Sequence, residues 1–197
     1  YANEIVYLFL AGFLLAAALE RWNAHSRIAF AMIALIGLRG RRVVLGVMVA
    51  TAFISMWISN TATAAMMYPI ALAIAPLFSD DAAGRDLRTA LMLGIAYAAS
   101  IGGIGTLIGT PPNLVLAGAA PDLAGRSIGF VEYMSIGVPI VLILLPLTWA
   151  LLVFVVFRRR AELGDGAAGE VVVAGGGIAL GLARHRVGGV EHATGDA

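Results

Sequence analysis

The sequence predicts an all-α membrane protein built around two interrupted membrane segments. Of its 197 residues, 60% are hydrophobic and 13% are charged, whereas a water-soluble domain carries about twice that charged fraction. Several uncharged runs approach or exceed the roughly 20 apolar residues that a bilayer crossing needs. Two of these runs are broken in the middle by polar or helix-breaking residues. Together these observations predict an integral membrane protein with a re-entrant helical hairpin and a discontinuous transmembrane helix.

The residues that carry most enzyme chemistry are absent or scattered. The chain has no cysteine, which excludes disulfides, thiolate metal sites and cysteine nucleophiles. The three histidines, His25, His185 and His192, lie outside the apolar runs at no metal-ligand spacing, and we expect them on the surface. No nucleophile–base pair is visible, so we expect no enzyme. The net charge of +1 gives no reason to expect a nucleic-acid partner.

Residues 1–42 predict one transmembrane helix and one helix at the membrane interface. The apolar run Ile5–Leu19 is closed by Glu20 and Arg21 and is short for a full crossing. The chain does not begin with methionine and shows no signal-peptide pattern, so we expect it to be an internal piece whose upstream sequence completes this helix. The next segment, His25–Arg42, has apolar residues at helical spacing between basic flanks and favours an interfacial helix. A short buried helix is the alternative.

Residues 43–79 form the first interrupted run. No charged residue occurs in this range, but the stretch "WISNTATAAMMYP" places Ser59, Asn60 and Thr61 near its middle. Each half of about 16 residues would cover roughly 24 Å, less than a full crossing. Arginines flank both ends of the run, and basic residues favour the cytoplasmic side. We therefore predict a re-entrant helical hairpin with its tip at the three polar residues.

Residues 86–120 form the second interrupted run and predict the discontinuous transmembrane helix. The segment begins as a helix and then meets four glycines and two prolines between Gly102 and Pro112. Proline removes a backbone donor and clashes with the preceding turn, and glycine weakens a helix by about 1 kcal/mol per residue. The helix is therefore expected to break near Gly102–Pro112 and to restart at Asn113.

The last part of the chain predicts one continuous crossing and an irregular tail. Residues 133–157 are apolar and are followed by three arginines, which mark a cytoplasmic end. Pro139 and Pro146 are candidate kink sites in this helix. Residues 161–197 change abruptly to scattered Gly, Ala, Val and Arg without a helical period. We interpret them as a flexible tail or as the product of DNA translated out of frame.

Two breaks in one small membrane protein must face each other, other protein or water, because backbone polar groups cannot be left open to lipid. Ser55 and Ser59 are four residues apart, so we expect them to share a helical face. If the two breaks pack together, neutral oxygen atoms converge there. They belong to Ser55, Ser59, Asn60, Thr106, Thr110 and the carbonyls around Gly109. Such hard oxygens suit an alkali cation such as Na⁺ better than a transition metal.

The same breaks predict donors for a small anion. The Asn60 amide and the Thr61 hydroxyl remain available, and the N-terminus of a helix expected to start at Ala62 adds a positive dipole end. The alternative interpretation is structural. Serine and threonine often bond back to a carbonyl one turn earlier and bend a helix, and small residues let helices approach closely.

Three stretches give the sequence a family resemblance: "LAGFLLAAALER", "SNTATAAMM" and "YAASIGGIGTLIGTPPNLVLAG". They resemble the divalent anion:sodium symporter family over residues 1–160, in its N-terminal half. The resemblance implies half of an inverted-repeat transporter in the inner or plasma membrane. Residues 1–42 would lie on the scaffold or arm side, and residues 43–160 would form half of the transport domain. A homodimer of the full-length protein and elevator-like motion are implied as well.

The resemblance also implies roles for particular residues. The first sodium site would be formed by Ser55, Ser59, Asn60 and the carbonyl of Gly109, with Na⁺ as the coupling ion and no other metal. Substrate contacts would come from Ser59, Asn60, Thr61, Thr110 and Pro111. The implied substrate is a small divalent organic anion, a dicarboxylate such as succinate, malate or citrate.

The sequence departs from the family in one respect. It contains one Ser-Asn-Thr sequence, whereas each half of the family's fold contributes one, so this chain alone is not expected to transport. Two alternatives stay open. One is a transporter of sulfate or another anion that has the same architecture and uses protons or exchange. The other is a membrane scaffold subunit in which the breaks serve only packing.

Overall fold

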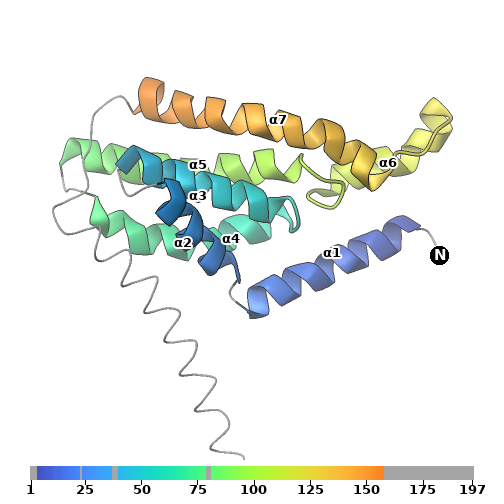
Figure 1. Ribbon diagram of the computed structural model, residues 1–197, viewed down its shortest axis with the longest axis horizontal. Helices are drawn as coiled ribbons and strands as arrows, with labels where there is room; N and C mark the ends of the chain where they lie inside the picture. The colour runs from blue at the N-terminus through green and yellow to red at the C-terminus, as the bar shows by residue number, and fades with distance from the viewer. Residues whose placement is uncertain (1–3, 23, 37–39, 79–80, 158–197) are drawn as a thin grey trace, which may run out of the picture.

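The computed structural model describes residues 4–22, 24–36, 40–78 and 81–157, and every regular element in them is helical, which confirms the all-α class (Figure 1). In chain order the elements are α1 (Glu4–Arg21), α2 (Ala24–Ile36), α3 (Gly40–Ser55), α4 (Asn60–Ile74), η1 (Ala75–Leu77), α5 (Ala82–Gly103), α6 (Pro111–Ala124), α7 (Phe130–Ala150) and η2 (Leu151–Val156). The predicted tail, 161–197, lies outside the described residues, so its interpretation stays a prediction.

Helices α3 and α5 form the centre of the molecule, and they make the most extensive contact between any two described elements. They run in the same direction, because Gly94 faces Met48 and Gly102 faces Ala52. A Cβ atom on Gly102 would lie 2.6 Å from the Cα atom of Ala52. The two helices therefore approach backbone to backbone near their C-terminal ends, and those ends lie at the same level.

Helix α2 packs against the outer side of α3. A Cβ atom on Gly46 of α3 would lie 3.1 Å from the Cα atom of Ile33. His25, Ala29 and Ile33 are buried and four residues apart, so they share one helical face. The expectation of a surface position was therefore wrong for His25, because the face that covers α3 includes the first turn of α2. His185 and His192 lie outside the described residues, and the interfacial position of α2 stays a prediction.

Both predicted helix breaks are present, with different boundaries. Helix α3 ends at Ser55 and α4 begins at Asn60, so only Ser59 of the three polar residues lies outside a helix. The expected start at Ala62 was wrong, because Ser59 caps the helix from the position directly before Asn60. Helix α5 ends at Gly103, and α6 begins at Pro111.

The restart of the second helix therefore precedes the predicted residue, Asn113. A proline is tolerated in the first helical turn, because the backbone donor that it lacks has no helical partner there. The two prolines thus open α6 rather than lying before it. Both breaks occur at the same end of the α3–α5 pair (Figure 1).

Helix α7 runs along the α3–α5 pair (Figure 1), and it continues through the π-helical segment η2 to Val156. Among the described residues, Phe130–Val156 is the one helix that is long and apolar enough to cross a bilayer. It agrees closely with the predicted crossing at 133–157. At one end the indole of Trp149 donates to the Arg41 carbonyl at 3.0 Å, which ties α7 to the start of α3.

Candidate functional site

The two helix breaks contact each other directly. The hydroxyl of Thr106, in the second break, donates to the carbonyl of Met56, in the first break. Gly105 also lies against the Met56 side chain, where a Cβ atom would come within 2.8 Å of its terminal methyl carbon. Two segments that are 50 residues apart in the chain therefore cover each other's open backbone groups, as the sequence predicts.

The first break is stabilised by the turn around Ser59. Its hydroxyl oxygen accepts from the Ala62 N–H at 3.3 Å, and its carbonyl accepts from the Thr63 N–H at 2.9 Å. Ser59 therefore belongs to the cap of α4, whereas Ser55 is the last residue of α3. The expectation that Ser55 and Ser59 share a helical face was wrong, because the chain turns between them.

Ser55 lies at the centre of an oxygen cluster. Its side chain is fully buried, and its hydroxyl oxygen lies 2.6 Å from the Ala99 carbonyl oxygen and 2.9 Å from Asn60 Oδ1. A serine hydroxyl has a single proton, so it donates to one of these acceptors at a time. Three oxygen atoms therefore lie close together with a single hydroxyl proton among them.

Gly103 extends the cluster toward the second break. A Cβ atom at this position would overlap Asn60 Oδ1 and lie 3.0 Å from Asn60 Cγ. On its other side, a Cβ atom on Gly109 would lie 2.5 Å from the Gly103 carbonyl oxygen. Gly103 therefore lies between Asn60 and Gly109, and only glycines permit this spacing of the three residues.

The second break has one internal side-chain anchor, Asn113. This residue is 8% exposed, and its Nδ2 atom lies 2.8 Å from both the Gly103 and the Thr106 carbonyl oxygens. Sequence reasoning used Asn113 only as a helix start and did not single out Gly103 or the Ala99 carbonyl. A polar residue directly after Pro-Pro at a helix start was the available signal for Asn113.

The predicted site residues divide by exposure. Ser55 and Gly109 are buried, whereas Ser59, Thr61 and Pro111 are exposed. Asn60 and Thr110 are intermediate. Two of the four predicted cation ligands are therefore buried, whereas none of the five predicted substrate contacts is. Ser59 and Asn60 belong to both groups; Ser59 is exposed, and Asn60 is intermediate.

The helix ends at the two breaks place partial positive and partial negative charges in this region. The first turns of α4 and α6 begin at the two breaks, and the last turns of α3 and α5 end there. Helix N-termini favour negative charge and C-termini favour positive charge, through their unpaired N–H and C=O groups. Among the described residues, no group of three acidic or histidine side chains could hold a metal ion. The oxygen atoms at this site are therefore neutral ones.

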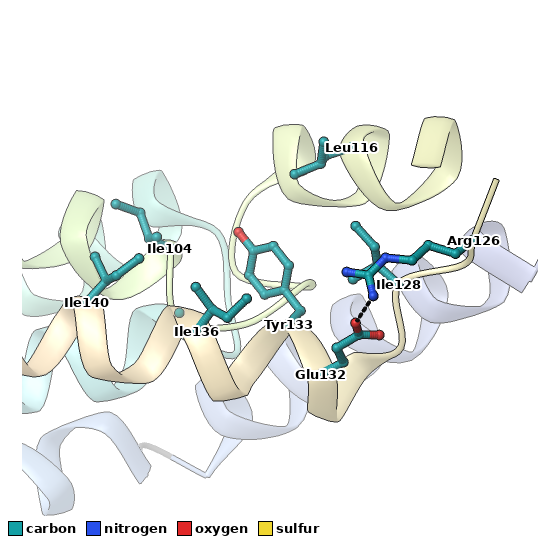
Figure 2. Close-up of a pocket in the computed structure, with 9 residues that line it drawn as sticks. Ile104, Leu116, Arg126, Ile128, Glu132, Tyr133, Ile136 and Ile140 are labelled. Atoms are coloured by element: carbon teal, nitrogen blue, oxygen red, sulfur yellow. Dashed lines mark ion pairs between the residues drawn. The ribbon is translucent and has the colours of Figure 1, made fainter. Parts of the chain in front are cut away.

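A separate cavity of about 210 Å³ lies between α6 and α7 (Figure 2). Its walls are mostly isoleucine and leucine side chains together with the ring of Tyr133. Arg126 and Glu132 form an ion pair of 3.2 Å at its edge and are 70% and 43% exposed. An apolar cavity whose one charged pair is already neutralised is unsuited to a small dianion, so it is not part of the candidate site.

Comparisons of the sequence with known proteins identify a transporter family and several relatives. A model of the citrate transporter family matches residues 1–191. The sodium-dependent dicarboxylate transporter SdcS of Staphylococcus aureus (strain NCTC 8325 / PS 47) is 46% identical over 166 residues, 81% of this chain. The same transporter from strains COL and N315 has the same identity and coverage. The chain spans 32% of the length of these relatives.

Proposed function

We propose that this chain, which belongs to the citrate transporter family, forms part of a Na⁺-coupled transporter of divalent organic anions. The family agrees with the resemblance to divalent anion:sodium symporters, and its members are multi-pass integral membrane transporters rather than enzymes. The relatives named above are sodium-dependent dicarboxylate transporters. By this proposal the substrate is a dicarboxylate such as succinate or malate, or citrate in its divalent form.

The observation that carries the proposal is that hydrogen-bond acceptors outnumber donor protons around Ser55. Asn60 Oδ1 and the Ala99 carbonyl oxygen both lie within 2.9 Å of Ser55 Oγ, and the three oxygen atoms share one hydroxyl proton. A cation bound among these oxygen atoms would offset the repulsion between their partial negative charges, and neutral hard oxygens favour an alkali cation. Ser55, Ser59, Asn60 and the carbonyl of Gly109 would hold Na⁺. The C-terminal ends of α3 and α5 favour the same charge.

The exposed side of the breaks supports the anion site. Ser59 and Thr61 are exposed beside the first turn of α4, where free N–H groups attract a carboxylate. Pro111 is exposed at the start of α6, which contributes its positive dipole end only, because Pro111 and Pro112 have no N–H. With Asn60 and Thr110 they would contact one carboxylate of the substrate. A cation held one layer deeper attracts the same anion, which explains in physical terms how binding of the two solutes is coupled.

The rest of the transporter architecture belongs to the same proposal. Helices α3 and α4 would form a re-entrant hairpin, and α5 and α6 the two parts of a discontinuous transmembrane helix in the transport domain. A second Ser-Asn-Thr hairpin outside this chain would complete the substrate site through an inverted repeat. The full-length protein would be a homodimer with elevator-like motion. Sulfate transport by proton coupling or exchange, and a scaffold role, are the competing proposals.

The decisive experiment compares two serine substitutions in the full-length transporter that contains this chain. Ser55→Ala removes the hydroxyl at the centre of the oxygen cluster, and Ser100→Ala removes an exposed hydroxyl that only bonds the Ala96 carbonyl. Succinate uptake into proteoliposomes is measured against Na⁺ concentration. Loss of a ligand of a charged group costs about 1.5–3 kcal/mol, so Ser55→Ala should raise the half-saturating Na⁺ concentration about 10- to 100-fold. Ser100→Ala should leave it unchanged.

Two further measurements distinguish the proposed function from its competitors. Replacement of Na⁺ by choline should abolish uptake, and undiminished uptake would favour proton coupling or exchange. Asn60→Ala removes a group placed at both sites, so it should abolish uptake while the protein still assembles. Uptake that survives Asn60→Ala would favour the scaffold interpretation.

A further inference from the structure

We infer that Asn113 is a positioning residue for cation binding: its amide holds the carbonyl framework of the second break in place. The inference rests on the function proposed above. Asn113 itself is assigned no contact with Na⁺ or substrate.

The amide nitrogen of Asn113 is fully used within the protein. It lies 2.8 Å from the Gly103 carbonyl oxygen and 2.8 Å from the Thr106 carbonyl oxygen, and an amide NH₂ group has two protons to donate. The side chain is 8% exposed. Gly103 is the last residue of α5, so its carbonyl is among those that have no partner within the helix.

The two carbonyls held by Asn113 belong to residues that connect the breaks. Gly103 lies between Asn60 and Gly109, with a Cβ atom on Gly109 only 2.5 Å from the Gly103 carbonyl oxygen. Thr106 donates its hydroxyl to the Met56 carbonyl in the first break. One amide therefore holds two of the points at which the second break contacts the first.

This arrangement has a consequence for the predicted ligands. With Asn113 in place, the Gly103 and Thr106 carbonyls are directed to its amide, and the chain between them and Gly109 has one shape. Without the donor, the buried Gly103 carbonyl must find another partner, and the Thr106 carbonyl keeps only the long bond from the Gly109 N–H at 3.4 Å. The Gly109 backbone, which packs on Gly103, is then expected to move with these carbonyls. Groups that orient metal ligands in this way typically alter metal affinity about 10- to 100-fold when they are removed.

The test uses two variants of Asn113 and one control in the full-length transporter. Asn113→Leu has nearly the same size but presents no donor to the two carbonyls, and Asn113→Ala removes the whole side-chain amide. Val115→Ala changes an exposed residue, 69% accessible, on the same helix. The measurement is thermal unfolding of the purified protein in detergent against Na⁺ concentration, with choline balancing ionic strength. Ligand binding to the native state raises the melting temperature, so this readout needs no transport.

Both Asn113 variants should shift the Na⁺ concentration for half-maximal stabilisation upward by about 10- to 100-fold, while Val115→Ala leaves it unchanged. At saturating Na⁺, the KM for succinate in uptake assays should stay within about twofold, because the substrate contacts are not altered. A role in folding alone would lower the melting temperature at every Na⁺ concentration without moving the half-maximal concentration.

Three outcomes would overturn the inference or its premise separately. If the unmodified protein is stabilised by Na⁺ and both Asn113 variants respond at the same Na⁺ concentration, the positioning role is wrong and the proposed function stands. If the unmodified protein shows no stabilisation by Na⁺ over choline, the cation site itself is wrong. Loss of the folded protein in both variants at saturating Na⁺ would also overturn the inference, because Asn113 would then be needed for folding rather than for ligand placement.

Discussion

The interrupted helices and the continuous helix α7 satisfy their backbone hydrogen-bonding groups in opposite ways. In α7 the backbone groups are paired within the helix except where Pro139 and Pro146 remove a donor, and large apolar side chains such as Leu142, Ile143 and Leu147 point outward. At the two breaks the backbone groups cannot pair within a helix, and glycines and hydroxyl groups bring them against protein instead. The breaks therefore place their open backbone groups against protein, whereas the outward face of α7 is apolar and exposed.

The difference shows where this protein can bind a small ion. A continuous apolar helix has no free backbone group to offer a ligand. A break offers carbonyls and amides at a defined position, but only if close packing keeps them from collapsing onto one another. Helix α7 contributes to that packing at Gly137, where a Cβ atom would lie 2.7 Å from the Ile104 carbonyl oxygen of the second break.

The largest expected effect comes from filling the contact between α3 and α5. Gly102→Ala would place a Cβ atom 2.6 Å from the Ala52 Cα atom, and backbone atoms cannot move aside as a flexible side chain can. We expect a loss of stability of about 3 kcal/mol or more, or failure to fold. Gly12→Ala is the matched control, because its nearest contact would be an ordinary 3.7 Å to Ile108. Thermal unfolding of the full-length protein measures both, and equal melting temperatures would contradict the close backbone contact.

An intermediate effect is expected on the exposed side of α7. Ile143 is 66% exposed near the middle of the apolar helix. If this face meets lipid, Ile143→Arg should oppose membrane insertion of the helix by about 3 kcal/mol. Leu123→Arg, at an exposed position near the end of α6, serves as the control and should cost little. A glycosylation-mapping assay of insertion compares the two. Equal insertion efficiencies would indicate that another part of the transporter covers Ile143.

The smallest effect is expected at Thr63, in the first turns of α4. Within the part of the chain that the structure describes, its fully buried hydroxyl has no hydrogen-bond partner, whereas the Thr51 hydroxyl donates to the Val47 carbonyl at 2.7 Å. Thr63→Val removes an unsatisfied polar atom and should leave stability unchanged or raise it by up to about 1 kcal/mol.

Thr51→Val is the matched control and should cost about 1 kcal/mol, because it removes a buried hydrogen bond. Chemical denaturation of the two variants side by side in the full-length protein gives the comparison. A greater loss of stability for Thr63→Val than for Thr51→Val would mean that the Thr63 hydroxyl has a partner in the complete transporter.

The sequence by itself determined the class of the protein, the positions of both breaks within a few residues, and the continuous helix near 133–157. These features depend on local chemistry. Gly102–Pro112 ends a helix wherever it is placed, since glycine and proline act within one turn. The resemblance carried by "SNTATAAMM" and the Gly-Thr-Pro-Pro-Asn stretch led to the family that the comparisons identify.

Only the tertiary structure decided which atoms meet. It separated Ser55 from Ser59 by a turn, buried His25 against α3, and placed Gly103 between Asn60 and Gly109. It also gave Asn113 a role that its neighbours in the sequence do not indicate. The physical reason is that these contacts depend on the register of α3 against α5, whose bonded residues Ser55 and Ala99 are 44 positions apart in the chain. That register is set by glycine-to-backbone packing in three dimensions, which no local pattern encodes.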